Sequence, residues 1–305
     1  MSILLVIPNR KLDKLIEKFH SILPDVKIQV WPEVSDALAV EYIVAWQPPK
    51  GSLAPFVNCK AIASFGAGVD SLLQYDGLPN VPITRIVDDN LASDMSRYVL
   101  THILAYQHRV ELYVKQQQEK LWKPKRARMG NKVTVLGAGQ LGTASANLLR
   151  LNGFDVSVWS RTAKSLEGIT SYAQDDLARA VSDADYIVCL LPSTKHTHNM
   201  IDHSFLSKTK KGVVIINVAR GDIIDEQSLL ANLDSGQVAH AILDVFSIEP
   251  LPQTHAFWQH SAITITPHCS ALSNVDTVTR QLCDNYLRLK AGQALVNTVD
   301  CDLGY

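Results

Sequence analysis

The sequence lacks the features that mark secreted and membrane proteins. No apolar run approaches the roughly 20 residues that a helix needs to span a bilayer. The first residues, MSILLVIPNRK, have no basic segment ahead of their apolar residues and no small-residue cleavage pattern. They predict a first β-strand, not a signal peptide. We therefore expect a cytoplasmic protein that has no membrane partner.

Cysteine is scarce and follows no recognisable spacing. The five cysteines are an odd number and contain no CxxC pair, whereas disulfide frameworks and zinc sites usually need paired or closely spaced cysteines. The five cysteines are therefore expected to be structural thiols. The histidines of LLPSTKHTHNMI and the nearby His203 do not complete a metal-binding pattern with acidic or thiol groups, so no metal site is predicted.

Excess charge of one sign is also lacking. The formal net charge is −1, whereas a nucleic-acid partner or an anionic membrane is usually met by a clearly basic face. The only dense basic run, KPKRAR at residues 123–128, is interpreted as a solvated connection. A nucleic-acid partner is therefore not expected. The 47% hydrophobic content over 305 residues is typical of a globular protein of two domains.

Short apolar runs alternate with helical patterns along the whole chain, which predicts α/β architecture with parallel sheets. Five candidate strands lie in the first third and six more follow from Lys132. They are ILLVIP, VKIQV, YIVAW, AIASF and PITRI, then KVTVLG, DVSVWS, ADYIVCLLP, GVVIINVA, HAILDVF and AITITPH.

Two longer helical segments follow these two groups of strands, one after each. ASDMSRYVLTHILAYQHRVELYVKQQQ contains no Gly or Pro and is predicted to be one long helix. The last helical segment, SNVDTVTRQLCDNYLRLKAG, can return to the first domain and close it. We therefore predict a discontinuous domain of residues 1–96 and 276–305, and a second domain of residues 97–275.

The run VLGAGQLG follows a predicted strand and opens a predicted helix. Gly137, Gly139 and Gly142 form the pattern GxGxxG, in which the glycines allow a tight turn, close approach of the backbone to a pyrophosphate, and close packing of helix on strand. Gln140 and Leu141 complete the turn. Free N–H groups at the helix N-terminus favour the phosphates, so the sequence predicts dinucleotide binding.

The next predicted strand ends in VSVWSR. An NAD-binding domain usually has an acidic residue at the end of this strand for a ribose hydroxyl, but this chain has Ser160 followed by Arg161. Without a carboxylate nothing repels the 2′-phosphate of NADP, and Arg161, helped by Lys164, can bind it. We therefore expect NADP(H) as the preferred cofactor, with NAD(H) possible. The alternative is that Arg161 is a solvated turn residue.

Polar residues follow three later strands of the second domain. They are Arg220, Glu249 and His268, and ligands of doubly wound sheets bind at the carboxyl ends of the strands. Each residue alone could be a surface charge or a strand-end histidine. Together they match the reduction of a 2-keto acid, which needs a proton donor for the carbonyl oxygen and a cation for the carboxylate.

The flanking blocks INVARGDIIDEQSLL, ILDVFSIEPLP and TPHCSA, with SFGAGVDSLL at residues 64–73, resemble the D-isomer-specific 2-hydroxyacid dehydrogenases. Within this family, FGAGVD, WSR and DVFSIEPLP are most similar to the glyoxylate/hydroxypyruvate reductases of the A type. The resemblance implies a flavodoxin-like substrate domain and a Rossmann cofactor domain, both doubly wound parallel sheets, with a cleft between them. It also implies a homodimer.

The resemblance also implies residue roles. His268 is the expected proton donor, Glu249 stabilises its protonated imidazole, and Arg220 holds the substrate carboxylate with its planar fork. Asp244 is expected at the nicotinamide carboxamide, with a structural role at the strand end as the alternative. Substrate contacts are expected from Ala67, Gly68 and Val69, and further cofactor contacts from Leu191, Pro192, Val218 and Ala219. Because of its own position, at the end of YIVAW and before QPP, Trp46 is a candidate wall of the substrate pocket, with a core tryptophan as the alternative.

These expectations add up to NADPH-dependent reduction of small 2-keto acids, glyoxylate to glycolate and hydroxypyruvate to glycerate. Two alternatives stay open. One is a relative that acts on a larger 2-hydroxy acid, although a phosphorylated substrate would need additional cations in the first domain and residues 65–70 supply none. The other is a nucleotide-sensing binding module of the corepressor kind.

Overall fold

The computed structural model describes residues 2–75 and 77–304. The chain forms two compact units, unit 1 with residues 1–90 and 273–305 and unit 2 with residues 91–272. The sequence placed the first division later, between residues 96 and 97. The difference arises because Met95 already packs in the hydrophobic core of unit 2.

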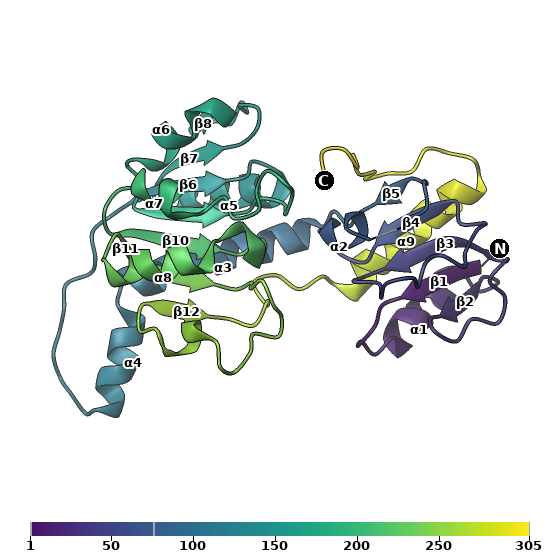
Figure 1. The fold of residues 1–305 in the computed structure, drawn as a ribbon, viewed down its shortest axis with the longest axis horizontal. Coiled ribbons are helices and arrows are strands. Elements are labelled where there is room, and N and C mark those ends of the chain that lie inside the picture. The colour runs from purple at the N-terminus through teal and green to yellow at the C-terminus, as the bar shows by residue number, and fades with distance from the viewer. Residues whose placement is uncertain (1, 76, 305) are drawn as a thin grey trace. The chain divides into compact units, whose positions relative to one another are not determined.

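Unit 1 is built on a parallel sheet of five strands in the order β2-β1-β3-β4-β5 (Figure 1). All of its neighbouring strands pair in parallel. The strands match the five apolar runs predicted in the first third of the chain. Their bounds are β1 Ser2–Val6, β2 Lys27–Val30, β3 Val40–Ala45, β4 Ala61–Ser64 and β5 Ile83–Thr84.

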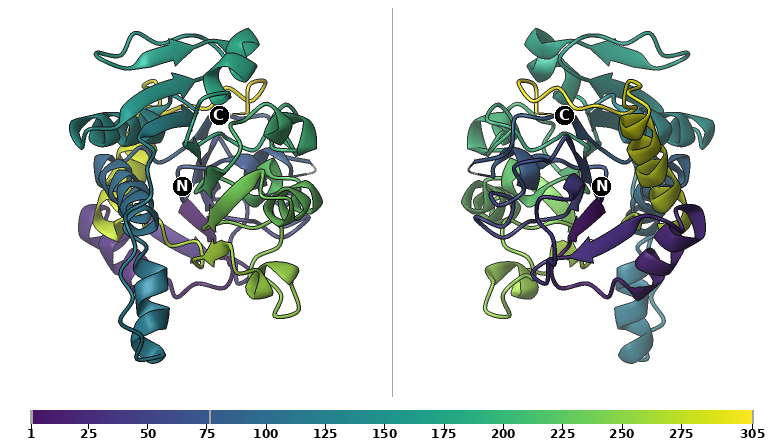
Figure 2. Two further views of the ribbon diagram at one scale, coloured as in Figure 1. Left: turned by 90° about the vertical axis from the view of Figure 1, so that its left-hand side faces the viewer. Right: turned by 90° about the vertical axis from the view of Figure 1, so that its right-hand side faces the viewer.

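Two helices from opposite ends of the chain cover one face of this sheet. α1 (Asp13–Ile22) buries Phe19, and α9 (Val275–Lys290) buries Leu282 and Tyr286 in the same apolar cluster. The right-hand view of Figure 2 shows α9 (yellow) beside α1 (purple). The other face packs against residues 53–59 and the short helix α2 (Asp70–Leu73). The final helical segment of the sequence thus belongs to the core of unit 1.

Unit 2 contains a parallel sheet of seven strands in the order β12-β11-β10-β9-β6-β7-β8. Six strands correspond to the predicted apolar runs, and the edge strand β8 (Thr170–Tyr172) was missed because it is short and polar. The two all-parallel sheets confirm the predicted α/β class. The other bounds are β6 Lys132–Leu136, β7 Asp155–Trp159, β9 Tyr186–Cys189, β10 Val213–Asn217, β11 Val238–Leu243 and β12 Ile263–Ile265.

Helices cover both faces of the second sheet. α3 (Asp89–Gln107) and α5 (Gln140–Leu151) pack in one apolar cluster. α6 (Leu177–Val181), α7 (His203–Ser207) and α8 (Glu226–Asp234) pack in the other. Burial on both faces explains why the strands read as continuous apolar runs. Three short 3₁₀ segments complete the unit: η1 Gln174–Asp176, η2 Gly221–Ile223 and η3 Ala256–Gln259.

The prediction of one long helix between the two series of strands was wrong. The structure has α3, a break at Arg109, and then α4 (Val110–Gln118). Arg109 adopts the left-handed conformation with φ of 58°, and its side chain donates to the carbonyl of Arg126 at 2.8 Å. A non-glycine residue rarely takes this conformation, so no sequence signal marked the break. In Figures 1 and 2, α4 stands away from the body of unit 2.

Within the described part of the chain, no helix combines the length and the apolar character that crossing a membrane requires.

Candidate active site

The glycine-rich turn joins β6 to α5 at the carboxyl edge of the sheet of unit 2. Gly137 has φ of 106°, and its N–H donates to Trp159 O at 2.8 Å. A Cβ at Gly137 would lie 2.5 Å from Leu190 O, and one at Gly142 would overlap the Gly137 carbonyl. Neither position therefore accepts a side chain without backbone movement.

Gly139 differs from its two partners because a Cβ there would meet nothing within 4 Å. The space beside its backbone is open, and the N–H groups of the first turn of the 12-residue α5 begin at this point. Open space beside the N–H groups of a helix N-terminus is what a pyrophosphate requires. The residues present therefore fit a dinucleotide.

Ser160, Arg161 and Lys164 lie in one turn that follows β7. Because Gly137 N–H bonds the carbonyl of Trp159, this turn is next to the glycine-rich turn. Ser160 Oγ donates to Thr162 O at 2.8 Å, while the side chains of Arg161 and Lys164 are exposed. The turn thus presents two cations and no carboxylate where a ribose is expected.

The residues after β9 and β10 are mostly buried. Leu191, Val218 and Ala219 are 8%, 4% and 7% exposed, and Pro192 is half-buried. Leu190 N–H donates to Leu136 O at 2.8 Å, which sets this segment beside the end of β6. Because these side chains are packed in the core, the groups that these residues expose at the edge of the sheet are chiefly backbone atoms.

Arg220 follows β10 in a turn that a buried asparagine holds. Asn217, which is fully buried, accepts from Ala219 N–H at 3.1 Å and donates to Arg220 O at 2.8 Å. Gly221 packs directly on the backbone of Phe246, where a Cβ would overlap it. This contact brings the Arg220 turn against the segment that leads to Glu249.

Glu249 and His268 form a hydrogen-bonded pair. Glu249 Oε2 lies 2.7 Å from His268 Nδ1, and Glu249 Oε1 accepts from Phe246 N–H at 3.0 Å. Burial alone would raise the pKa of Glu249, but these hydrogen bonds and the charges of His268 and Arg220 together hold it below its usual value. The carboxylate bonded to Nδ1 orients the imidazole ring, and Nε2 is then the second polar atom of that ring.

The backbone of His268 is strained, and neighbouring groups hold it. Its φ is 51°, in the left-handed region, and its N–H donates to Asp244 O at 2.8 Å. Asp244 is fully buried, and its carboxylate accepts from Thr266 Oγ1 at 2.5 Å and from the N–H groups of Cys269 and Ser270, both at 2.9 Å. The carbonyl and carboxylate oxygens of Asp244 thus accept the hydrogen bonds that hold the loop that carries His268.

Two members of this network, Thr266 and Tyr98, were not predicted from the sequence. Thr266 Oγ1 lies 2.5 Å from the hydroxyl of Tyr98, which comes from α3. The Tyr98 ring packs on His102 with a centroid separation of 4.2 Å. Thr266 stands two residues before His268, so a search for hydroxyls beside a buried strand-end acid would have found it. Tyr98 carried no such signal.

The predicted carboxylate loop of unit 1 follows β4. Ser64 Oγ donates to Gly68 O at 2.7 Å and accepts from Gly66 N–H at 3.2 Å, which closes the loop on itself. In residues 2–75 and 77–304, the N–H groups of Ala67, Gly68 and Val69 donate no hydrogen bond. Consecutive unpaired N–H groups in a tight loop suit an anion.

Trp46 follows β3 and packs on this loop. A Cβ at Gly66 would overlap the six-membered ring of Trp46. Glycine is therefore required for the ring to lie on the loop backbone. The indole is half-buried, so one side is packed and the rest is accessible.

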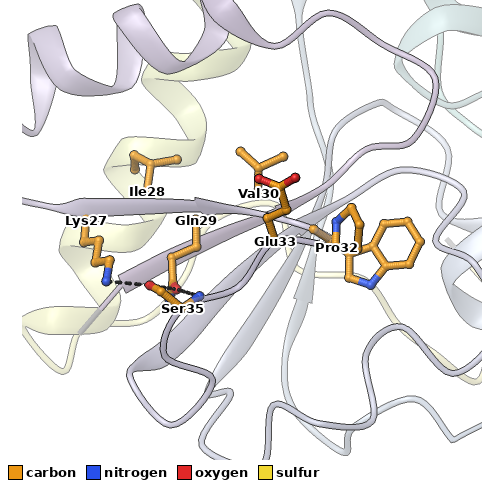
Figure 3. Close-up of a pocket in the computed structure, with 8 residues that line it drawn as sticks. Lys27, Ile28, Gln29, Val30, Pro32, Glu33 and Ser35 are labelled. Carbon is orange, nitrogen blue, oxygen red and sulfur yellow. Dashed lines mark hydrogen bonds between the residues drawn. The ribbon is translucent and has the colours of Figure 1, made fainter.

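A separate hollow lies at the edge strand β2, between Lys27 and Ser35 (Figure 3). Lys27 Nζ donates to Ser35 Oγ at 2.8 Å, and Gln29 Oε1 accepts from the same hydroxyl at 3.0 Å. These polar groups are used within the chain. None of the predicted site residues lines the hollow.

Within residues 2–75 and 77–304, the side chains form neither a metal centre nor a disulfide. Among the residues that the structure describes, no group of three His, Cys, Asp or Glu side chains is arranged to hold a metal ion. All five cysteines are free, and burial raises the pKa of the Cys189 thiol to about 12.

A parallel sheet with a glycine-rich turn after β6, its first strand along the chain, places unit 2 in the class of dinucleotide-binding domains. Residues 100–270 match the family model for the D-isomer specific 2-hydroxyacid dehydrogenase, NAD binding domain. The chain is 37% identical over 314 residues to glyoxylate/hydroxypyruvate reductase A of Yersinia enterocolitica serotype O:8, with 100% of both chains covered.

Solved structures also match over the full chain, among them the following two. One is a D-isomer specific 2-hydroxyacid dehydrogenase from Xanthobacter autotrophicus Py2 in complex with NADPH and MES, with a TM-score of 0.93, 33% identity, and coverage of 100% of this chain and 99% of that one. The other is an NADPH-dependent glyoxylate/hydroxypyruvate reductase from Sinorhizobium meliloti in complex with NADP and sulfate, with a TM-score of 0.93, 28% identity and 100% coverage of both chains.

This chain belongs to the D-isomer-specific 2-hydroxyacid dehydrogenase family. The resemblance inferred from the sequence blocks is thereby confirmed, and so is the expectation of an oxidoreductase with a nicotinamide dinucleotide cofactor.

Proposed function

We propose that the protein reduces small 2-keto acids with NADPH, glyoxylate to glycolate and hydroxypyruvate to glycerate. One 2-keto acid, one NADPH and one proton give one 2-hydroxy acid and one NADP⁺. In this proposal unit 2 binds the cofactor and contributes Arg220 for the substrate carboxylate, and unit 1 contributes the N–H groups of its carboxylate loop. The observation that carries the proposal is the 2.7 Å hydrogen bond between His268 and Glu249 beside the Arg220 turn.

The bound cofactor would supply the hydride for the carbonyl carbon. Gly137, Gly139 and Gly142 shape the turn for its pyrophosphate. His268 Nε2 gives the proton to the carbonyl oxygen, and Glu249 stabilises the protonated imidazole through Nδ1. Arg220 binds the substrate carboxylate and polarises the carbonyl.

The choice of NADPH over NADH rests on the turn after β7. Ser160 leaves the ribose position without a carboxylate, and Arg161 with Lys164 presents cations to a 2′-phosphate. The complexes of the Xanthobacter and Sinorhizobium proteins with NADPH and NADP support this preference. NADH would bind by the same turn but gain nothing from the two cations.

Initial rates of NADPH oxidation with glyoxylate and with hydroxypyruvate test the proposal. The wild-type protein should turn over both substrates. Arg220→Ala should bind NADPH normally in a fluorescence titration but lose roughly 100-fold or more in kcat/KM, because a charge-assisted bidentate contact is removed. Lys211→Ala, which removes an exposed cation after α7, is the control and should match wild type. Unchanged turnover in Arg220→Ala would exclude the assigned role.

We further propose that the protein is a homodimer that associates through the arm, defined as α4 and residues 119–130. Trp122 and Met129 are 98% and 95% exposed, and Val114 and Leu121 about half. An apolar set of this size on one projecting element suits an interface. Light scattering should give a dimer for wild type and a monomer for Trp122→Ser with Met129→Ser. Leu151→Ser, a change at an exposed leucine of α5, should leave the dimer intact.

A further inference from the structure

Arg10 lies at the carboxyl edge of the sheet of unit 1, over two aromatic rings. Its guanidinium carbon is 5.8 Å from the ring centroid of Trp46 and 5.7 Å from that of Phe65. Both distances are within the range of an attractive cation–π contact.

The sheet explains why these three residues meet. β1, β3 and β4 are consecutive in the strand order, and each is followed by one of them. Trp46 N–H donates to Val6 O at 3.0 Å, and Phe65 N–H donates to Ala45 O at 3.0 Å. Asn9 turns the chain after β1 with φ of 61°. The parallel strands thus deliver Arg10, Trp46 and Phe65 to one edge.

The charge of Arg10 is available to a ligand. The side chain is exposed, and within the described residues no carboxylate pairs with it. A guanidinium that lies over aromatic faces keeps its N–H donors in its own plane, away from the rings. The rings therefore orient the cation without using its hydrogen-bonding capacity.

The two rings also connect Arg10 to the proposed carboxylate loop. Phe65 and Gly66 begin the loop, and the Trp46 ring packs on Gly66, one residue before Ala67. The first unpaired N–H of the loop belongs to Ala67. Unit 1 therefore has two adjacent groups that can bind negative charge, the N–H groups of the loop and the Arg10 guanidinium.

We infer that Arg10 binds a second negatively charged group at the distal end of the substrate, so that the protein reduces 2-keto dicarboxylates as well as simple 2-keto acids. The inference rests on the proposed function, in which the loop holds the first carboxylate. The expectation that unit 1 supplies no further cation considered only residues 65–70, and Arg10 reaches that loop from β1.

Oxaloacetate and 2-ketobutyrate form a matched pair for the test, because both have four carbons and only oxaloacetate has a distal carboxylate. Wild type should favour oxaloacetate in kcat/KM with NADPH. Arg10→Gln should lower kcat/KM for oxaloacetate roughly 10- to 100-fold, the effect of losing one charge-assisted contact. Its values for 2-ketobutyrate and glyoxylate should change less than about threefold. Lys11→Gln removes the neighbouring exposed cation and should leave the ratio unchanged.

Three results would overturn the inference: equal losses with all substrates, no loss with oxaloacetate, or a wild type that reduces glyoxylate and rejects oxaloacetate. Binding of D-malate and D-2-hydroxybutyrate by calorimetry gives a readout that needs no turnover. If wild type reduced no 2-keto acid, the proposed function would fail. Arg10 would still be tested, because Arg10→Gln must weaken D-malate and not D-2-hydroxybutyrate.

Discussion

The carboxylate of Asp244 accepts a hydrogen bond from the hydroxyl of Thr266 at 2.5 Å. The same hydroxyl lies 2.5 Å from that of Tyr98. This chain of contacts runs from α3 to a buried acid at the end of β11, and from there to the backbone of the loop that carries His268. The position of His268 thus depends on Tyr98 and Thr266, two polar residues that touch neither substrate nor cofactor in our proposal.

Thr266→Val should impair the reaction without impairing cofactor binding. The change removes one donor from Asp244 and the partner of the Tyr98 hydroxyl, so the loop around His268 loosens. We expect a loss of about 1–3 kcal/mol in the free energy of unfolding and roughly a tenfold fall in kcat. Urea denaturation and steady-state kinetics with NADPH measure the two effects.

Thr266→Ser is the matched control because it keeps the hydroxyl and removes only a methyl group. It should recover most of the kcat lost in Thr266→Val. If both variants had the same kcat, the effect would come from packing and the hydrogen bonds would have no role in placing His268.

Glu249→Gln should shift the pH range of activity. The amide cannot stabilise a protonated imidazole as a carboxylate does, so the alkaline limb of kcat/KM for reduction should move to lower pH, with kcat at pH 7 lowered roughly 10- to 100-fold. On the acid side, the pKa of Glu249 is lowered from 4.5. Its contribution to folding is therefore present above about pH 4.5 and is lost as the pH falls through the native value.

Glu226→Gln is a control for the loss of a His–Glu pair as such. Glu226 Oε2 lies 3.1 Å from His255 Nε2 in the same unit, and neither residue is among the predicted site residues. Its pH–rate profile should superimpose on that of wild type. A Glu249→Gln profile that did the same would show that Glu249 does not act on the proton donor.

The sequence predicted the parts of the molecule that depend on local patterns. Eleven apolar runs became strands because burial on both faces requires continuous apolar sequence, and GxGxxG follows a local rule of backbone space. The break at Arg109 and the contact of Tyr98 with Thr266 were not predictable in this way. Both depend on segments far apart in the chain, Arg126 for the first and α3 with the end of β12 for the second.

Two single substitutions in the glycine-rich turn should distinguish effects on folding from effects on cofactor binding. Gly139→Ala places a methyl group in open space at φ of −78°, so its free energy of unfolding should stay within about 0.5 kcal/mol of wild type. The methyl group occupies the space proposed for the pyrophosphate. The Kd for NADPH should therefore rise at least tenfold, which corresponds to about 1.4 kcal/mol.

Gly142→Ala should show the opposite order of effects. Its Cβ would overlap the carbonyl of Gly137, so α5 must move from β6 and unfolding should become easier by about 1–3 kcal/mol. Thermal denaturation without cofactor distinguishes the two variants. Equal destabilisation of both would mean that Gly139 is also a packing position.

The turn after β7 should decide which dinucleotide is used. Arg161→Ala should raise the KM for NADPH roughly 10- to 100-fold, because a charge-assisted contact with the 2′-phosphate is lost, and should change the KM for NADH less than about threefold.

Ser160→Asp should add repulsion of the same phosphate and supply a partner for the ribose of NADH. Together with Arg161→Ala it should reverse the preference for NADPH over NADH. Since Lys164 follows Arg161 in the same exposed turn, Lys164→Ala should act in the same direction with a smaller effect. Equal changes in both KM values for Arg161→Ala would place that side chain outside the ribose site.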